Sequence, residues 1–236
     1  MNAVGKIMRR FVSRWRSRAR AARLRAAHVG DRTVLAGRVQ VYGWSAVRIG
    51  VNSVICDDTL INALNFPSDQ PVVLIGSHCF IGRRNFFTAG PELRVGDYTL
   101  TGPDCHFLGA QHDYGSPFVP YALAACTGER IALGVNCWLG ARVTVLKGVQ
   151  IGHGSIIGAC SLVTRDIPPF SIAIGNPAQV VKRFDARQQR WVPTADYPAD
   201  GDAHLPREAD YLAMLQRSHP APRMPVDGVG LERGDF

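Results

Sequence analysis

A period of six residues runs through the middle of the chain. From 133 to 163 every sixth residue is apolar, and glycine follows four of these six residues. The apolar positions are Leu133, Leu139, Val145, Ile151, Ile157 and Val163, and the fifth positions of their units are Cys137, Val143, Val149, Ser155, Ser161 and Ile167. A fixed period with small or β-branched fifth residues is typical of repeat architectures, in which each unit is buried only by its neighbours.

The same pattern occurs upstream, with slips of phase around 62–74 and 87–94. Its first positions are Ile49, Ile55, Ile75, Ile81, Val95 and Thr101, and its fifth positions are Ser53, Thr59, Cys79, Asn85, Thr99 and Cys105. Each unit is predicted to form a short strand and a turn, and strands of successive coils pair about 4.8 Å apart. The sequence therefore predicts an all-β coil with flat sides, interrupted by loops where the phase slips.

The net charge of +8 is concentrated at the start of the chain. Residues 1–28 hold nine basic residues and no acidic one, whereas the remainder holds 18 basic and 19 acidic residues. The body of the protein is therefore not the basic surface of a nucleic-acid-binding protein. Val4, Phe11 and Trp15 recur on one face of a helix over residues 1–28, which favours binding to an anionic membrane surface. A solvated tail, a nucleic-acid arm and a transit peptide are alternatives.

The sequence lacks a secretory signal, a membrane-spanning segment and a zinc-binding cysteine pattern. No apolar segment follows the basic start, and no run of about 18 apolar residues occurs. The six cysteines include no CxxC pair, so we expect reduced thiols, no zinc knuckle and a cytoplasmic protein, with the inner face of the membrane as its peripheral location. Cys79, Cys105 and Cys137 are predicted to fill the core.

Three segments resemble a known family. They are VGDYTLTGPDCHFLGAQHDY at 95–114, CWLGARVTVLKGVQIGHGSIIGACSLVTRDIPP at 137–169 and GNPAQVVKR at 175–183. From Ile75 to Arg183 the chain resembles the hexapeptide-repeat acyltransferases, above all the maltose/galactoside O-acetyltransferases and the colanic-acid-type polysaccharide acetyltransferases. The resemblance implies a left-handed parallel β-helix with a protruding loop over 29–183. It also implies a homotrimer with sites between subunits, and acetyl-CoA as co-substrate with no metal.

His112 is the candidate catalytic residue. It lies in a non-repeat insertion at about 109–131, and loops on rigid scaffolds commonly carry catalytic groups. A neutral histidine is suited to act as a general base near pH 7. The resemblance implies direct transfer in a ternary complex, whereas the insertion alone would equally fit a surface histidine without a role.

The resemblance also suggests binding residues. Small outward residues would let pantetheine lie against the backbone, and cations near the last coil would bind the CoA phosphates. The cofactor-binding candidates are Trp138, Gly140, Ala141, Gly158, Ala159, Thr164, Arg165, Lys182 and Arg183, and the acceptor-binding candidates are Asn85, Asp113 and Tyr114. Asn85 fits an inner polar ladder as well. Because Asp113-Tyr114 follows the histidine, as in the polysaccharide branch, the expected acceptor is a hydroxyl of a sugar, polysaccharide or glycolipid precursor.

The period ends after Arg183, so 184–236 is predicted to be a C-terminal extension with a short helix near 205–217. His153 follows a glycine and is predicted to be solvated. A γ-type carbonic anhydrase, with His78, His106 and His112 on zinc, is the rival enzyme. A non-catalytic trimeric scaffold at the membrane is the second alternative.

Overall fold

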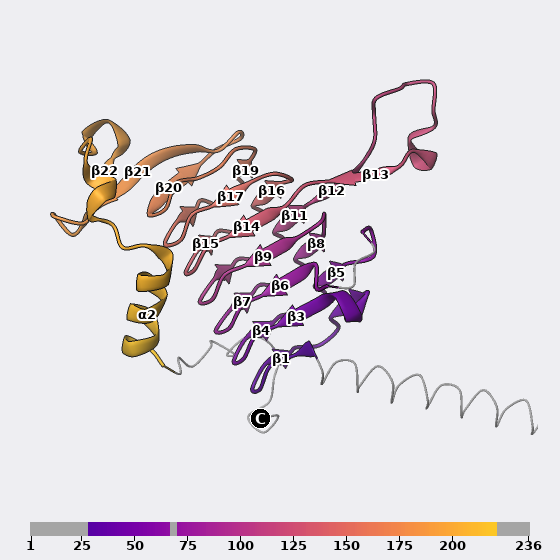
Figure 1. Cartoon of the computed structure of the whole chain (residues 1–236), viewed down its shortest axis with the longest axis horizontal. Coiled ribbons are helices and arrows are strands. Elements are labelled where there is room, and N and C mark those ends of the chain that lie inside the picture. Colours follow the sequence, from indigo (N-terminus) through magenta and orange to yellow (C-terminus); the bar gives the residue numbers. More distant parts are fainter. Residues whose placement is uncertain (1–27, 67–69, 221–236) are drawn as a thin grey trace, which may run out of the picture.

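The computed structural model describes residues 28–66 and 70–220, which form a stack of flat-sided coils (Figure 1). The predicted basic helix over residues 1–28 lies outside the described residues, apart from His28. Within the described part, no helix combines the length and the apolar character needed to cross a bilayer. The described residues comprise the coil, its hairpin and its C-terminal extension.

Three parallel sheets form the sides of the coil in the described residues, and the chain visits them in the order I, II, III. Sheet I consists of β3 (Val47–Ile49), β6 (Val73–Ile75), β9 (Leu93–Val95), β14 (Ile131–Leu133) and β17 (Gln150–Ile151). The coil strands of sheet II are β1 (Val34–Leu35), β4 (Val54–Ile55), β7 (Phe80–Ile81), β10 (Leu100–Thr101), β15 (Trp138–Leu139), β18 (Ile156–Ile157) and β20 (Ser171–Ile174). Sheet III consists of β2 (Gln40–Tyr42), β5 (Leu60–Asn62), β8 (Phe86–Thr88), β11 (His106–Leu108), β16 (Thr144–Leu146) and β19 (Leu162–Val163).

The period of six is confirmed by burial. All twelve first-position residues named above are buried, and so are the twelve fifth-position residues. Phe87 and Phe107 continue the column on sheet III, with their rings stacked at a centroid distance of 4.5 Å. Because side chains alternate along a strand, the first and third residues of the three-residue strands of sheet I, such as Val47 and Ile49 of β3, both point inward. Successive coils therefore bury one continuous core.

The corner between sheets II and III is built from small residues. A Cβ added at Gly140 would lie 2.6 Å from the backbone nitrogen of Ala159 in the next coil, and a Cβ at Gly102 would lie 2.6 Å from that of Ala141. Such contacts are too close for any side chain, so glycine at this corner lets the coils approach to the spacing of paired strands. The glycines of the repeat therefore set the stacking.

The C-terminal extension folds back on the coil. β21 (Gln179–Asp185) and β22 (Arg190–Pro193) continue sheet II as antiparallel strands, so the predicted boundary at 183/184 falls inside β21. Short 3₁₀ turns η3 (Thr194–Asp196) and η4 (Gly201–His204) lead to α2 (Glu208–Ser218), which agrees with the predicted helix. A further 3₁₀ turn, η1 (Trp44–Ala46), lies in the first coils.

Helix α2 lies along the corner between sheets I and II (Figure 1). Glu208 accepts a hydrogen bond from the backbone N–H of Val135 at 2.8 Å, and Tyr98 donates to the carbonyl of His219 at 3.1 Å. His153, predicted to be solvated, is instead buried beneath this extension. Its Nε2 donates to the carbonyl of Pro206 at 3.0 Å, because a carbonyl oxygen only accepts.

Candidate active site

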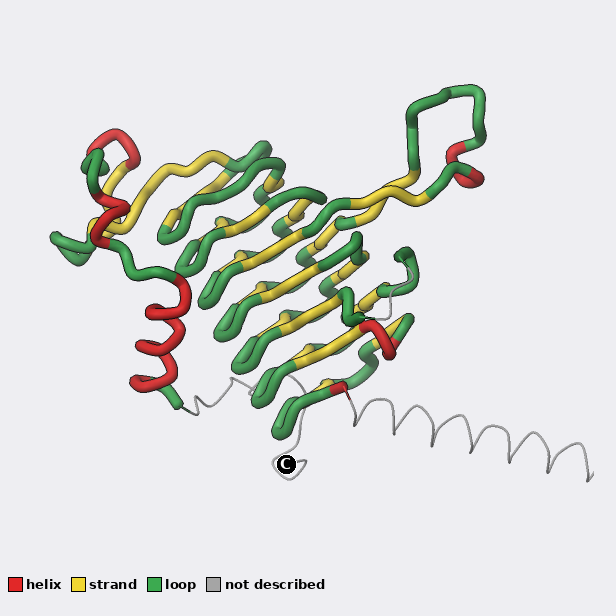
Figure 2. The backbone as a smooth tube through the Cα atoms, viewed as in Figure 1, coloured by secondary structure: helices red, strands yellow, loops and turns green. Residues whose placement is uncertain are grey.

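The insertion that carries His112 forms a hairpin at the corner between sheets III and I. β12 (Ala110–His112) and β13 (Cys126–Gly128) pair antiparallel, and η2 (Tyr121–Leu123) lies in the loop between them. Figure 2 shows this hairpin and its loop standing clear of the stacked coils. Large apolar side chains at the tip face solvent, with Phe118 94% and Leu123 79% exposed.

His112 lies directly across the hairpin from Cys126. The backbone N–H of Asp113 donates to the carbonyl of Ala125 at 2.8 Å, so His112 and Cys126 form a non-hydrogen-bonded pair. Side chains of such a pair project from the same face of the hairpin and lie closer together than in the alternate pairs. The imidazole therefore has an exposed thiol as its nearest cross-strand neighbour.

A backbone carbonyl determines which imidazole nitrogen can act as a base. Nδ1 of His112 lies 3.2 Å from the carbonyl oxygen of Ala124. Because that oxygen only accepts, Nδ1 carries the proton and Nε2 keeps its lone pair. The exposed imidazole thus presents an unprotonated nitrogen away from the hairpin loop, which suits removal of a proton from a bound hydroxyl.

Three glycines allow the base of the hairpin to pack on the coil. A Cβ at Gly90 would lie 2.5 Å from the carbonyl oxygens of Gly109 and Glu129, and a Cβ at Gly128 would lie 2.8 Å from Cζ of Phe66. These residues were not identified from the sequence. Gly109 and Gly128 flank the insertion on either side, and that symmetric placement outside the repeat phase is the signal that could have found them.

Two of the acceptor-binding candidates lie in the hairpin loop beside His112, and the third lies inside the coil. Asp113 accepts a hydrogen bond from the N–H of Gly115 at 3.0 Å and so shapes the turn after His112, while Tyr114 is 71% exposed. Asn85 is 1% exposed inside the coil, where it donates to the carbonyls of Gly82 and Gly102 at 2.7 and 2.9 Å. The acceptor-binding prediction for Asn85 is therefore corrected, because its amide belongs to the inner polar ladder.

Most of the cofactor-binding candidates gather along one edge of sheet II. Trp138 projects outward from β15 with half of its surface exposed. The small residues that follow β15 and β18, at the corner between sheets II and III, are Gly140, Ala141, Gly158 and Ala159. Lys182 is exposed on β21, paired with Ile172. Thr164 and Arg165 are exposed just after β19 of sheet III, at the corner between sheets III and I, and so lie apart from the others. Gly140 and Gly158 carry no side chain and Ala141 and Ala159 carry only a methyl group, so these four residues place no long side chain over this corner.

Arg183 is the exception among them. Its side chain is only 10% exposed, forms an ion pair with Asp202 and lies over the ring of Tyr197, 4.5 Å from the ring centroid. The phosphate-binding prediction for Arg183 is therefore corrected, because its guanidinium is already engaged by Asp202 and Tyr197 within the C-terminal extension. The sequence could not show this, since Asp202 and Tyr197 lie far along an extension without a repeat.

The hairpin and the small-residue corner lie at different corners of one chain. The corner of Gly140 and Ala159 precedes sheet III, whereas the hairpin follows β11 at the far end of the same sheet. A strand of three residues covers roughly 10 Å, so sheet III separates the two features. Within a single chain, His112 and this corner therefore belong to different edges of the coil.

The three histidines that the carbonic anhydrase alternative would place on zinc, His78, His106 and His112, are not close together in the folded chain. Nδ1 of His78 lies 2.9 Å from the side-chain amide of Asn52 and its ring stacks on Tyr98, while His106 lies on the outer side of sheet III against Phe86. Among the described residues no three histidine, cysteine or acidic side chains come close enough to hold a metal ion. The structure therefore offers no support for that alternative.

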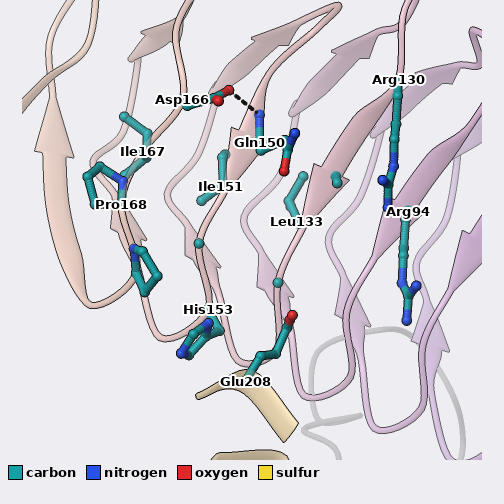
Figure 3. Close-up of a pocket in the computed structure, with 14 residues that line it drawn as sticks. Arg94, Arg130, Leu133, Gln150, Ile151, His153, Asp166, Ile167, Pro168 and Glu208 are labelled. Atoms are coloured by element: carbon teal, nitrogen blue, oxygen red, sulfur yellow. Dashed lines mark hydrogen bonds between the residues drawn. The ribbon is translucent and has the colours of Figure 1, made fainter. Parts of the chain in front are cut away.

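Two of the hollows in the described residues, one on sheet I and one on sheet II, lie away from His112. One, of about 480 Å³, lies on sheet I, and Figure 3 shows Arg94 and Arg130 on one side of it and His153 and Glu208 beside α2. Its polar groups serve the fold: Asp166 accepts from the N–H of Gln150 at 2.7 Å, and Arg130 pairs with Glu92 at 3.0 Å. The other, of about 780 Å³, lies between sheet II and the extension, with Trp138 and Trp191 in its wall.

Comparison with known proteins identifies the repeat. Residues 133–165 match the family model described as bacterial transferase hexapeptide, with six repeats. The chain carries the hexapeptide repeat of bacterial transferases. This repeat, together with the parallel coil, implies left-handed winding.

Relatives of this hexapeptide-repeat chain are named acetyltransferases. A protein of Staphylococcus aureus strain COL with that name is 40% identical over 124 residues, which cover 48% of this chain and 56% of the relative. The chloramphenicol acetyltransferase of Klebsiella aerogenes is 33% identical over 121 residues, covering 50% and 55%. The chain thus spans about half the length of these curated relatives.

A solved structure shares the fold. A mutant of AntD, an N-acyltransferase from Bacillus cereus in complex with dTDP and coenzyme A, superposes with a TM-score of 0.57 at 20% identity, covering 69% of this chain and 88% of that chain. At this identity the likeness concerns the fold alone.

Proposed function

We propose that this chain transfers an acetyl group from acetyl-CoA to a hydroxyl of a sugar, polysaccharide or glycolipid precursor, with His112 as general base. The observation that carries the proposal is the hydrogen bond from Nδ1 of His112 to the carbonyl of Ala124. It fixes the tautomer in which Nε2 can take a proton. The names of the relatives support acetyl transfer as the reaction.

The proposed reaction is a direct transfer. Nε2 of His112 removes the proton of the acceptor hydroxyl as the oxygen attacks the thioester carbonyl of acetyl-CoA. The tetrahedral intermediate collapses, the carbon–sulfur bond breaks, and the imidazolium returns its proton to the CoA thiolate. The products are the acetyl ester and free CoA. The chain contributes the base and its orientation, and acetyl-CoA is consumed as co-substrate.

The proposed site lies between two copies of the chain in a homotrimer. Its support is the separation of the hairpin from the small-residue corner, which a second copy would overcome by placing its hairpin beside that corner. The exposed apolar side chains Phe118 and Leu123 on the hairpin, and Leu100 and Trp138 on sheet II, would find partners in such an assembly. Closed cyclic symmetry gives every copy the same contacts.

The proposed path of CoA follows the small-residue corner. Pantetheine would lie past Trp138 and along Gly140, Ala141, Gly158 and Ala159, with Asp113 and Tyr114 near the acceptor. Lys182, which is exposed on β21, would then face the phosphates, since exposed cations favour phosphate oxygens. Thr164 and Arg165 follow sheet III, on its far side from this corner, and their contact with the phosphates stays a prediction from the resemblance. The basic residues of 1–28 would hold the enzyme at an anionic membrane surface, where a lipid-linked acceptor would be found.

The test is release of CoA thiol from acetyl-CoA in the presence of a panel of glycosides and polysaccharide fragments. His112→Ala is expected to lower kcat by about 10²- to 10⁴-fold, the usual contribution of a general base. His106→Ala is the matched control, because His106 is an exposed histidine on sheet III that the mechanism does not use. Equal loss in both variants, or full activity of His112→Ala, would contradict the proposal.

A further inference from the structure

The face of the hairpin that carries His112 also packs against the aromatic side chain of Phe66 at its base. Gly128 pairs with Ala110, and His112 pairs with Cys126 two residues farther along the strands. The N–H of Glu129 donates to the carbonyl of Gly109, so Ala110 and Gly128 also form a non-hydrogen-bonded pair. Because side chains alternate, the Cβ directions of all four residues share one face.

Phe66 lies on that same face. The position that a Cβ of Gly128 would occupy is 2.8 Å from Cζ and 2.9 Å from Cε2 of Phe66, so the ring lies on the Cβ side of Gly128. Two residues of strand separate Gly128 from Cys126, which is roughly 7 Å at the rise of an antiparallel strand. The Phe66 ring and the His112 imidazole are therefore neighbours along one surface, although they are far apart in sequence.

Hydrogen bonds hold the Phe66 loop in place. The side-chain amide of Asn65 donates to Oγ1 of Thr88 at 2.8 Å, and the amide of Asn62 donates to Oδ1 of Asn65 at 3.3 Å. Oδ1 of Asn62 also accepts from the backbone N–H of Leu64 at 3.1 Å. Asn62 and Thr88 are neighbours on sheet III, so the loop is fixed to the rigid coil directly before the ring.

We propose that Phe66 is the platform for the acceptor and that it selects a pyranose ring. The C–H face of a pyranose is apolar and stacks on an aromatic ring, while its hydroxyls remain at the edge. A sugar stacked on Phe66 presents an edge hydroxyl toward Nε2 of His112. Phe66 is thus a positioning and specificity residue that touches the sugar and takes no part in proton transfer. This inference rests on the proposed function.

Its test separates acceptor binding from catalysis. Saturation-transfer NMR with methyl glucopyranoside, methyl galactopyranoside and methyl mannopyranoside is expected to detect binding to the full wild-type chain. Phe66→Ala is expected to lose that signal and to raise the acceptor KM at least tenfold, with the KM for acetyl-CoA unchanged. Phe66→Tyr and Phe66→Trp are expected to restore both, because an aromatic face returns.

Leu64→Ala is the matched control, because Leu64 is a large apolar residue of the same loop, 62% exposed, which contacts Gly43 away from the hairpin. It is expected to behave as wild type in both measurements. Pyranoside binding that survives Phe66→Ala overturns the inference, and so does a wild type that binds none of the three probes. If the probes bind but no acetyl is transferred to any acceptor, the proposed function fails while the platform stands.

Discussion

A single backbone contact gives His112 its chemical character. The Ala124 carbonyl holds Nδ1, and antiparallel register places Cys126 beside the imidazole. The sequence predicted His112 because the residues around it resemble a family segment. It did not predict Cys126 or Phe66 as neighbours, since strands of three residues carry too little periodicity to fix a register. The neighbours of His112 are therefore known only from the folded structure.

Alkylation of Cys126 is expected to block the proposed reaction. Cys126 and Cys160 are exposed, whereas burial raises the pKa of Cys79 and Cys137 to about 12 and that of Cys56 and Cys105 to about 11. N-ethylmaleimide should therefore modify the two exposed thiols first, because the thiolate is the reactive form. Bulk on Cys126 would crowd the imidazole across the strand.

The measurement is acetyl transfer before and after N-ethylmaleimide treatment, with mass spectrometry to count the adducts. Cys126→Ser and Cys160→Ser are each expected to stay sensitive, because Cys160 follows Ala159 in the small-residue corner and its backbone N–H donates to the carbonyl of Ala141 at 2.8 Å. The double variant is expected to be active and resistant, and a double variant that is still blocked would place the reactive thiol elsewhere.

At the scale of elements, the hairpin depends on glycine contacts at its base. Gly90→Ala would place a Cβ 2.5 Å from two backbone oxygens of the hairpin, and a backbone contact that short cannot persist. We expect the hairpin to shift and transfer to fall more than tenfold, while circular dichroism still reports the intact coil. In the matched variant Gly115→Ala the nearest atom to the new Cβ is a side-chain oxygen of Asp113 at 3.4 Å, so activity should persist.

Charges of alternating sign follow the corner between sheets II and III. Asp58 pairs with Arg38, and Asp104 accepts two hydrogen bonds from Arg84 at 2.8 Å. The Arg84 guanidinium lowers the pKa of Asp104 below its usual value of 3.8. A carboxyl with a depressed folded-state pKa stabilises the fold above its unfolded pKa, and this contribution is lost as pH falls through the folded pKa.

Asp104→Asn is therefore expected to lower the melting temperature by about 2 °C at pH 7, the scale of one exposed ion pair. The difference from wild type should shrink as pH falls from about 5 to 3, because the wild-type carboxyl becomes protonated there. Thermal melts followed by circular dichroism at each pH would measure it. A difference in melting temperature between wild type and Asp104→Asn that stays constant across this pH range would show that the ion pair does not stabilise the coil.

Local repeats made the elements predictable, and their absence made the extension unpredictable. Each first-position residue, from Ile49 to Val163, is buried because a unit and its neighbours follow one rule. The surroundings of Arg183 and His153 were predicted wrongly, because the extension folds back over the coil. It does so through contacts that the six-residue period does not predict. Asn85 shows that a polar residue at a repeat position can belong to the core.

At the scale of the whole molecule, the coil is a scaffold that separates His112 from the small-residue corner. The hairpin leaves after sheet III, and the corner precedes it. The proposed homotrimer would reunite them, and the exposed apolar hairpin tip fits such an interface. The basic residues 1–28 lie outside the described residues, and their binding to an anionic membrane remains a prediction from the sequence.

Mixed trimers test this central claim most directly. His112→Ala removes the base, and Ala159→Trp fills the small-residue corner, so each variant alone should be inactive. In a cyclic trimer that contains both, one of the three sites joins an intact hairpin to an intact corner. Co-expressed and purified through two tags, mixed trimers should recover about one third of wild-type turnover. Mixed trimers as inactive as their parents would contradict a site shared between copies of the chain.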